Sequence, residues 1–149
     1  MKIAILNDTH CGIRNSSEIF LDNAEDFYTN IFFPECDKRN VKQIVHLGDY
    51  YDHRKFVNFK ALNQNRRVFL DQLRKRNMMM DIIPGNHDTY FKNTNELNSL
   101  KECLGHYMNE IHIIMEPTVM QYGSLSMALL PWICADNYQQ SMNFIQDCK

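Results

Sequence analysis

The chain has 149 residues, of which 44% are hydrophobic and 23% are charged, so it has the size and composition of one globular domain, or most of one, with a buried core. The formal net charge of −2 indicates neither a nucleic-acid binder nor an acidic partner. No stretch approaches the roughly 18 to 20 apolar residues needed to span a membrane, and the N-terminal run MKIAIL is too short for a signal peptide.

The five cysteines are odd in number, widely scattered, and include no C-x-x-C pair. This distribution argues against a disulfide framework or a zinc knuckle and favours reduced thiols in an intracellular setting. We therefore expect a cytoplasmic protein without a membrane association.

The first predicted elements are a strand and a long helix. Residues 2–7 form a short β-type run. Ser16-Ser17, followed by Glu18, predict the start of a helix that continues through Ile31. Pro34 should kink or restart that helix.

Strand and helix patterns continue to alternate along the chain: strand 42–47, helix 58–77, strand 78–83 and a helix at about 95–104. The last part is predicted to contain three short strands and a helical piece: 111–115, 118–122, 125–130 and 136–148. Alternation in the first hundred residues predicts βαβ units with a parallel sheet, whereas the later strands, joined by tight turns, look antiparallel. The expected fold is therefore a mixed α/β sandwich flanked by helices.

Each of the first three predicted strands is followed directly by a polar cluster, within ILNDTHCG, IVHLGDYYDHR and IIPGNHDTYFKN. Ligands of α/β sheets bind outside the carboxyl ends of strands, so we expect these clusters to converge. Convergence would gather seven side chains at one sheet edge: Asp8, His10, Asp49, Asp52, Asn86, His87 and Asp88.

Like charges packed this closely repel one another and lose hydration, and a bound cation relieves both effects. Carboxylate, imidazole and amide ligands suit a divalent ion such as Mn²⁺, with Mg²⁺, Fe²⁺ and Zn²⁺ as competitors. Taken singly, each cluster fits a turn or a helix N-cap equally well. Three clusters in order, each at a strand end, favour a metal site.

At these residues the chain resembles the calcineurin-like metallophosphoesterase superfamily, whose pattern is D-x-H … G-D-x-x-D … G-N-H-[DE]. The matching segments are Asp8-Thr9-His10, Gly48-Asp49-Tyr50-Tyr51-Asp52 and Gly85-Asn86-His87-Asp88. Within the superfamily the chain is most similar to the SbcD-type nuclease subunits of double-strand-break repair complexes, especially those of T-even-like phages. The stretches GDYYDHRK, GNHDTYFKNT and LLPWICADN carry this finer similarity.

The resemblance implies two divalent metal ions, with Mn²⁺ as the expected metal. Asp8 and His10 would bind one ion, and Asp49 would bridge both. Asn86 would bind the second ion through its amide oxygen. Two such ions can clamp the attacking and leaving oxygens of an in-line phosphoester displacement.

The resemblance also implies the catalytic roles. His87 would meet the phosphate and protonate the leaving oxygen, and Asp88 would fix the orientation of a ligand or of the histidine. Asp52 stands where many relatives carry a carboxylate that polarises the site, and Arg54 would meet a substrate phosphate. A solvated ion pair between Asp52 and Arg54 is the alternative.

Several further side chains are candidates for DNA contact or for packing. Lys55, Lys92 and Tyr90-Phe91 stand in predicted loops beside the site and could contact a DNA backbone or stack on a base. Trp132 is interpreted as a packing anchor.

One part of the family pattern is missing. The pattern continues with a lone histidine and a G-H-x-H segment, but after His87 this sequence has only His106 and His112, for which structural roles are expected. The chain also ends on NFIQDCK inside a predicted helix. We interpret residues 1–149 as a metallophosphoesterase (nuclease) domain, incomplete at its C-terminus, with most of one metal site and about half of the other.

Three hypotheses about function stay open from the sequence. The resemblance implies a metal-dependent DNA exo- and endonuclease of a recombination and repair complex, in the host cytoplasm if phage-encoded. It would pair with an SbcC-like ATPase and form a homodimer. The alternatives are an enzyme of the same superfamily acting on a small phosphodiester or phosphomonoester, and a catalytically incomplete scaffold that binds a partner or a DNA end.

Overall fold

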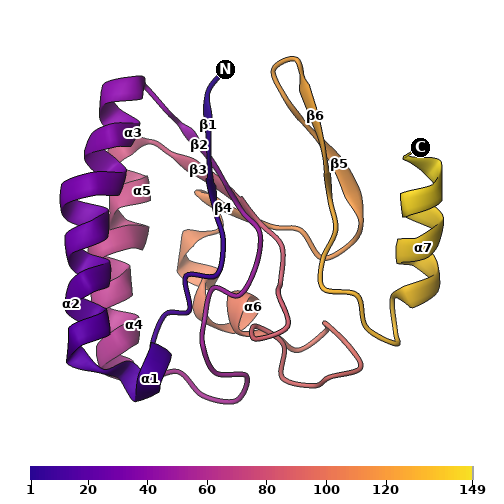
Figure 1. The fold of residues 1–149 in the computed structure, drawn as a ribbon, viewed down its shortest axis with the longest axis horizontal. Helices are drawn as coiled ribbons and strands as arrows, with labels where there is room; N and C mark the ends of the chain where they lie inside the picture. Colours follow the sequence, from indigo (N-terminus) through magenta and orange to yellow (C-terminus); the bar gives the residue numbers. More distant parts are fainter. Residues whose placement is uncertain (149) are drawn as a thin grey trace.

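A four-stranded parallel sheet forms the centre of the protein, whose residues 1–148 are described by a computed structural model. Its strands lie side by side in chain order: β1 (Ile3–Leu6), β2 (Gln43–His46), β3 (Met79–Ile82) and β4 (Ile111–Ile113). Right-handed crossovers between parallel strands in this order place the connecting helices on one face of the sheet. Figure 1 shows these helices stacked on that face.

Two long helical segments cover this face. The first comprises α1 (Ile13–Ser16), α2 (Glu18–Asp26), the π-helical η1 (Phe27–Phe32) and α3 (Phe33–Arg39), and the second comprises α4 (Phe59–Asn65), the π-helical η2 (Arg66–Leu70) and α5 (Asp71–Arg76). Pro34 restarts the first segment as α3, as predicted. The restart is smooth because the Phe33 N–H donates to the Tyr28 carbonyl in the wider π-turn, and Pro34 then occupies the first turn of α3, where its missing N–H is tolerated.

Successive strand residues point to opposite faces of the sheet and supply two hydrophobic clusters. On the helix side, Ile44 and Met80 are buried against Phe69 and Leu73. On the other side, Val45 is buried in a cluster with residues of the antiparallel hairpin β5 (Thr118–Tyr122) and β6 (Leu125–Leu129). The sheet is therefore covered by helices on one face and by a hairpin on the other, which confirms the predicted mixed α/β sandwich.

The antiparallel prediction is correct for 118–122 and 125–130 but wrong for 111–115. Strand β4 pairs in parallel with β3, with Met80 opposite Ile111. The connection between them is a crossover, which contains α6 (Ser99–Cys103) and the 3₁₀ turn η3 (Gly105–Tyr107). It returns the chain to the end of the sheet where the strands begin, so that β4 runs parallel to β3. Helix α6 is shorter than the predicted 95–104 because Asn98 caps it by accepting from the Lys101 N–H.

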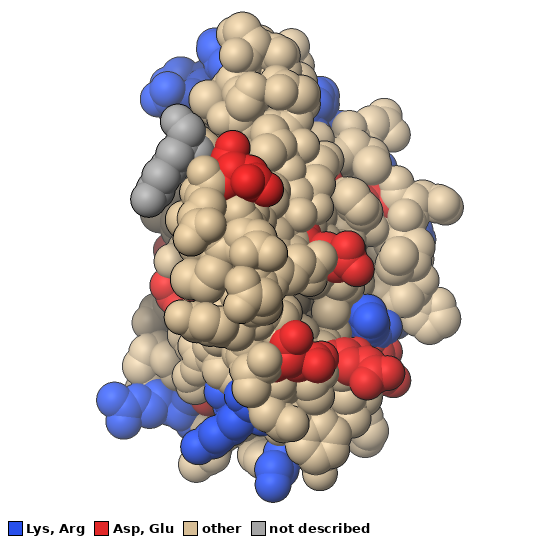
Figure 2. Space-filling view, turned by 90° about the vertical axis from the view of Figure 1, so that its right-hand side faces the viewer, with Lys and Arg blue, Asp and Glu red and all other residues tan. Residues whose placement is uncertain are grey.

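The final helix, α7 (Tyr138–Asp147), lies beyond the hairpin, on the side of the molecule away from the long helices (Figure 1). The face of the molecule seen from this side is mostly uncharged, with separate acidic residues over its middle and Lys and Arg side chains mainly toward its upper and lower ends (Figure 2). Within residues 1–148, no helix combines the length and apolar character needed to cross a membrane.

The C-terminal ends of β1, β2 and β3 are in register, with Leu6, His46 and Ile82 side by side. Three loops leave from this edge: the first loop (7–12), the second loop (47–58) and the third loop (83–98). Backbone hydrogen bonds continue the pairing beyond the strands, since the Asp8 N–H donates to the Gly48 carbonyl at 3.2 Å and the His10 N–H to the Asp49 carbonyl at 3.0 Å.

Two glycines allow the second and third loops to touch. A Cβ on Gly48 would lie 2.7 Å from the Gly85 nitrogen, and Gly48 has a φ of +101°, which L side chains rarely adopt. A Cβ on Gly85 would lie 2.2 Å from Asp49 Oδ1 and 2.3 Å from the Asp49 nitrogen. The close approach of these loops therefore requires glycine at both positions.

His46, the last residue of β2, is fully buried beneath the loops. Its Nδ1 accepts a hydrogen bond from the Gly48 N–H at 3.2 Å, so Nε2 carries the proton and donates to Thr9 Oγ1 at 3.0 Å. Burial lowers the pKa of this imidazole to about 3, and the neighbouring His10 contributes a smaller lowering. The fold thus stabilises neutral His46.

The buried histidine should make the protein sensitive to acid. The pKa of His46 is lower in the folded state than its unfolded value of about 6.5, so its stabilising contribution is complete above that pH and is lost as the pH falls toward 3. We expect His46→Asn, which keeps an acceptor near Nδ1, to reduce the pH dependence of the unfolding free energy by up to about 1.4 kcal/mol per pH unit. Urea denaturation between pH 7 and about pH 4 measures this pH dependence of the unfolding free energy. The substitution His106→Asn, at an exposed histidine, is the control. If the unfolding free energy of the unaltered protein, of His46→Asn and of His106→Asn changed equally with pH, the acid sensitivity would not come from His46.

The loop contact predicts different effects for two glycine substitutions. Gly85→Ala should destabilise the protein by about 1–3 kcal/mol or more, because the methyl group overlaps Asp49. Gly105→Ala is the matched control, since a Cβ there meets nothing within 4 Å, and its effect should stay within about 1 kcal/mol. Chemical denaturation of both variants checks the difference, and equal midpoints would show that the loops do not touch as described.

Candidate metal centre

The three loops bring together two overlapping groups of side chains that could hold a metal ion. The first group is Asp8, His10 and Asp49, and the second is His10, Asp52 and His87. Within each group the ligand atoms lie within 4.8 Å of one another, and His10 belongs to both. The predicted convergence of the strand-end clusters is therefore observed.

Three of these residues have an unusual backbone conformation. Asp8, His10 and Asp49 have φ values of +51°, +41° and +53°, in the left-handed region that residues other than glycine seldom occupy. The backbone hydrogen bonds between the loops hold this conformation. Strain of this kind collects at functional sites, where the surrounding structure fixes the side chains in place.

Asp8 forms the exposed side of the cluster. Its side chain is 55% exposed, its Oδ2 accepts a hydrogen bond from Asn7 Nδ2 at 2.5 Å, and its Oδ1 lies 3.6 Å from His10 Nε2. The first group is therefore open to solvent on one side, and a large ligand can reach it.

Two buried nitrogen atoms beside Asp52, one on His10 of the second group and one on the neighbouring His53, have no hydrogen-bond partner in the described structure. His10 Nδ1 lies 3.4 Å from Asp52 Oδ1, and His53 Nε2 lies 3.5 Å from Asp52 Oδ2, beyond ordinary hydrogen-bonding contact in this geometry. A buried polar atom that lacks a partner is costly unless a ligand satisfies it. The side chains of His10, Asp52 and His87 are together a donor set that fits a divalent cation.

His87 is held by two residues of the second loop, Asp49 and Asp52. Its backbone N–H donates to Asp49 Oδ1 at 2.8 Å, and its ring Nδ1 lies 2.7 Å from the Asp52 carbonyl oxygen. Since a carbonyl only accepts, Nδ1 carries a proton and Nε2 is the nitrogen left free. The ring meets that of His10 edge to face, with centroids 4.8 Å apart.

Asp88 joins the second and third loops from inside the protein. Its fully buried carboxylate accepts hydrogen bonds from the Tyr50 and Tyr51 N–H groups at 3.0 Å and from the Gly85 N–H at 2.9 Å. Burial raises the pKa of this carboxyl; the three backbone donors oppose that shift, and the charge of Asp49 adds to it. Asp88 therefore acts on the site through the loop backbones that it fixes.

The structure places the two remaining predicted site residues differently. Asn86 lies between Gly85 and His87, both of which approach Asp49, so its position belongs to the cluster. Arg54 instead donates from Nη1 to the carbonyl and hydroxyl oxygens of Thr89, at 3.3 and 3.2 Å. The alternative Asp52–Arg54 ion pair is not formed among the described residues, because Asp52 lies against histidines and Arg54 is bonded to the third loop.

The two late histidines lie outside the cluster, in line with the structural roles expected for them. His112 Nδ1 lies 3.1 Å from Asp81 Oδ1 on the neighbouring strand, and His106 is exposed in η3. Sequence reasoning did not identify His53 or His46 as part of the site. The available signal was a histidine at the end of the buried run before Gly48 and another directly after Asp52.

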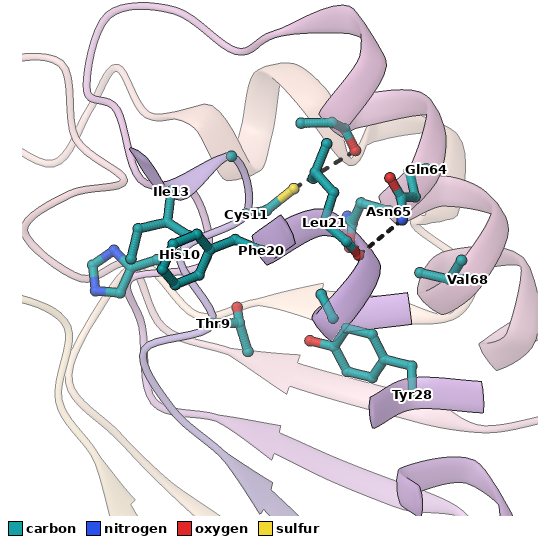
Figure 3. Close-up of a pocket in the computed structure, with 13 residues that line it drawn as sticks. Thr9, His10, Cys11, Ile13, Phe20, Leu21, Tyr28, Gln64, Asn65 and Val68 are labelled. Carbon is teal, nitrogen blue, oxygen red and sulfur yellow. Dashed lines mark hydrogen bonds between the residues drawn. The ribbon is translucent and has the colours of Figure 1, made fainter. Parts of the chain in front are cut away.

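A separate small cavity lies behind the first loop (Figure 3). Its volume is about 50 Å³, and its walls are mostly apolar side chains of the long helices, with His10 at one end and Val68 at the other. It is too small for a nucleotide and belongs to the packing beneath the loop.

Comparisons with known proteins agree with this architecture. Exonuclease subunit 1 of Enterobacteria phage T4 is 27% identical over 147 residues, which make up 98% of this chain and 42% of that protein. The crystal structure of the Pseudomonas putida nuclease MPE has the same fold, with a TM-score of 0.52 at 17% identity over 89% of this chain and 59% of that one. The chain thus spans less than two thirds of each of these relatives.

A family model described as calcineurin-like phosphoesterase matches residues 1–140. The matched range contains all three loops and every side chain of the two ligand groups. On this match, the chain belongs to the calcineurin-like phosphoesterase family.

Proposed function

We propose that this chain carries the metal centre of a metal-dependent nuclease that hydrolyses phosphodiester bonds in DNA. The observation that carries the proposal is the meeting of two ligand groups at one sheet edge, with His10 common to both. The similarity to a phage exonuclease subunit and the fold shared with a nuclease support a nucleic acid as the substrate.

The proposed ligands are the first group, Asp8, His10 and Asp49, together with Asn86 of the third loop. Asp8 and His10 would hold one divalent ion, Asp49 would bridge it to a second, and Asn86 would contribute an amide oxygen to the second ion. When bound, such ions polarise the phosphoester and make a water molecule nucleophilic near neutral pH. Mn²⁺ is the proposed metal, with Mg²⁺, Fe²⁺ and Zn²⁺ as alternatives, because the donors are a mixture of oxygen and imidazole nitrogen.

His87 is the proposed proton donor. The Asp52 carbonyl accepts the proton of Nδ1, so Nε2 is the ring nitrogen that can exchange a proton with a substrate. In its protonated form His87 can protonate the leaving oxygen of the cleaved phosphodiester. Asp88 supports this role indirectly, because it fixes the loop that carries His87 against the second loop.

The second candidate function is hydrolysis of a small phosphoester. The 55% exposure of the Asp8 side chain favours a large substrate, because a site for small molecules is normally enclosed.

The wider biological role is also part of the proposal. The relative is named as a subunit, which supports an assembly, and we propose an SbcC-like ATPase as the partner, a homodimer as the state and DNA recombination and repair as the process.

Metal binding should depend on the bridging carboxylate. We expect Asp49→Ala to weaken saturable Mn²⁺ binding by about 100-fold or more, since it removes an oxygen ligand and its hydrogen bond to His87. Calorimetric titration of Mn²⁺ measures this, and far-UV circular dichroism checks that the variant is folded. Asp147→Ala on α7 is the control and should titrate like the unaltered protein. Absence of any saturable site in the unaltered protein would favour the scaffold hypothesis.

Substrate class is tested by comparing a labelled DNA substrate with bis-p-nitrophenyl phosphate in the presence of Mn²⁺. We expect hydrolysis of both, and we expect His87→Asn to reduce DNA hydrolysis by about 10²–10⁴-fold because the proton donor is lost. Activity on the small ester with none on single- or double-stranded DNA would reject the nuclease assignment in favour of the second candidate.

A further inference from the structure

The third loop carries three of the proposed site residues, Asn86, His87 and Asp88, and several segments hold its backbone. Two carboxylates hold the loop on either side of Asn86, since Asp88 accepts from the Gly85 N–H and Asp49 accepts from the His87 N–H. A different set of contacts reaches the carbonyl group of Asn86 itself. These contacts lead away from the metal centre to the segment that follows β6.

Thr89 is the first member of this set. It is fully buried, and its hydroxyl group donates to the Asn86 carbonyl oxygen at 3.3 Å. The same Oγ1 accepts a hydrogen bond from Arg54 Nη1 at 3.2 Å. A hydroxyl group donates one hydrogen bond and accepts others, so both contacts can form at once. Thr89 therefore links a cation of the second loop to the backbone of a proposed metal ligand in the third loop.

The guanidinium group of Arg54 is directed toward the third loop by further contacts. Its Nη1 also lies 3.3 Å from the Thr89 carbonyl oxygen and 3.4 Å from that of Phe91. Its guanidinium carbon lies 5.1 Å from the centroid of the Trp132 ring, within the range of a cation–π contact. An aromatic face and three oxygen acceptors thus set the position of this side chain.

Trp132 connects Arg54 to both sides of the third loop. Its backbone N–H donates to the Pro84 carbonyl at 2.9 Å, and its own carbonyl accepts from Asn95 Nδ2 at 2.8 Å. Pro84 precedes the proposed site residues of this loop and Asn95 follows them, so Trp132 holds the two sides of the loop together. A change at Trp132 would therefore reach the metal centre through Arg54 and through the loop backbone.

We propose that Thr89, Arg54 and Trp132 form a relay that positions Asn86 for binding to the second metal ion. A neutral amide oxygen attracts a cation less strongly than a carboxylate does, so its contribution depends on the groups that orient it. The three residues are positioning residues, because they belong to neither ligand group and act through the Asn86 backbone. The inference rests on the proposed function and adds the residues that set the affinity for the second ion.

Calorimetric titration of Mn²⁺ into two Thr89 variants tests the relay. Thr89→Val keeps the shape of the buried side chain and removes the hydroxyl group, whereas Thr89→Ser keeps the hydroxyl group. We expect Thr89→Val and Arg54→Met to weaken the second step of Mn²⁺ binding by about ten-fold, as is typical when a partner that orients a ligand is lost, and to leave the first step unchanged. Thr89→Ser should titrate like the unaltered protein.

Variants of Trp132 test the far end of the relay in the same titration. Trp132→Leu removes the aromatic face beneath the guanidinium group and should weaken the second step by about three-fold, because Arg54 keeps its hydrogen bonds. Trp132→Phe keeps an aromatic face and should have a smaller effect. The order of the two variants, leucine weaker than phenylalanine, is the expected result, and equal affinities for both would remove Trp132 from the relay.

Arg74→Met is the matched control for Arg54→Met. Arg74 also lies over an aromatic ring, with its guanidinium carbon 4.9 Å from the Tyr107 centroid, and its Nη2 donates to the His106 carbonyl at 2.9 Å. It stands on α5, near the end of the sheet where β3 begins, whereas the three loops leave from the opposite end. Arg74→Met should therefore leave both steps of Mn²⁺ binding unchanged.

Amide hydrogen exchange in EDTA tests the relay without metal. We expect the backbone amides of residues 85–89 to exchange about ten-fold faster in Thr89→Val and Arg54→Met, because the loop opens more often once its hydrogen bonds are lost. The same amides should exchange at the unaltered rate in Thr89→Ser and in Arg74→Met. Circular dichroism checks that each variant is folded.

The outcomes separate this proposal from the proposed function. Unchanged Mn²⁺ affinities and exchange rates in Thr89→Val, or an equal weakening of both steps, would overturn the relay, and saturable Mn²⁺ binding would still support the metal centre. Faster exchange in a chain without saturable Mn²⁺ binding would reject the positioning role together with the metal centre. A second step that depends on Thr89, without hydrolysis of any DNA, would support the relay and reject the nuclease.

Discussion

The site depends on one buried carboxylate. Asp88 accepts three backbone hydrogen bonds from the loops that follow β2 and β3, and the contact between Gly48 and Gly85 lets these loops come close enough for that arrangement. An unpaired charge at this depth would be strongly destabilising, so the three donors and the carboxylate require one another. The same arrangement sets the positions of Asp49 and His87, whose mutual hydrogen bond links the two loops at the surface.

Much of the fold and of the site could be predicted from the sequence because the signals are local. The strand runs before Asp8, Gly48 and Pro84 have the expected bounds within one or two residues, and parallel strands in register bring their ends together. The direction in which the chain returns after Ile82 was harder to predict, because a short strand pattern such as 111–115 is the same in parallel and antiparallel pairing.

Contacts between distant segments could not be predicted. Nothing near Arg54 in the sequence indicates that it donates to Thr89 and lies over the Trp132 ring, with its guanidinium carbon 5.1 Å from the centroid. The pairing of His46 with Thr9 likewise joins residues of two different strand ends. Such partners are fixed by tertiary packing. A motif therefore specifies which residues converge, but not which of them belong to the possible metal-ligating groups and which hold the loops in place.

The left-handed conformations of Asp8, His10 and Asp49 set the stability of the protein against the proposed metal binding. Each such residue costs of the order of 1–3 kcal/mol relative to a relaxed backbone, and glycine would adopt the same conformation without that cost. Selection for thermal robustness alone would therefore favour glycine at these three positions and remove the proposed metal ligands. A protein that keeps aspartate and histidine there retains ligating side chains at the expense of thermostability, so laboratory evolution toward heat tolerance should be run with a simultaneous screen for metal binding.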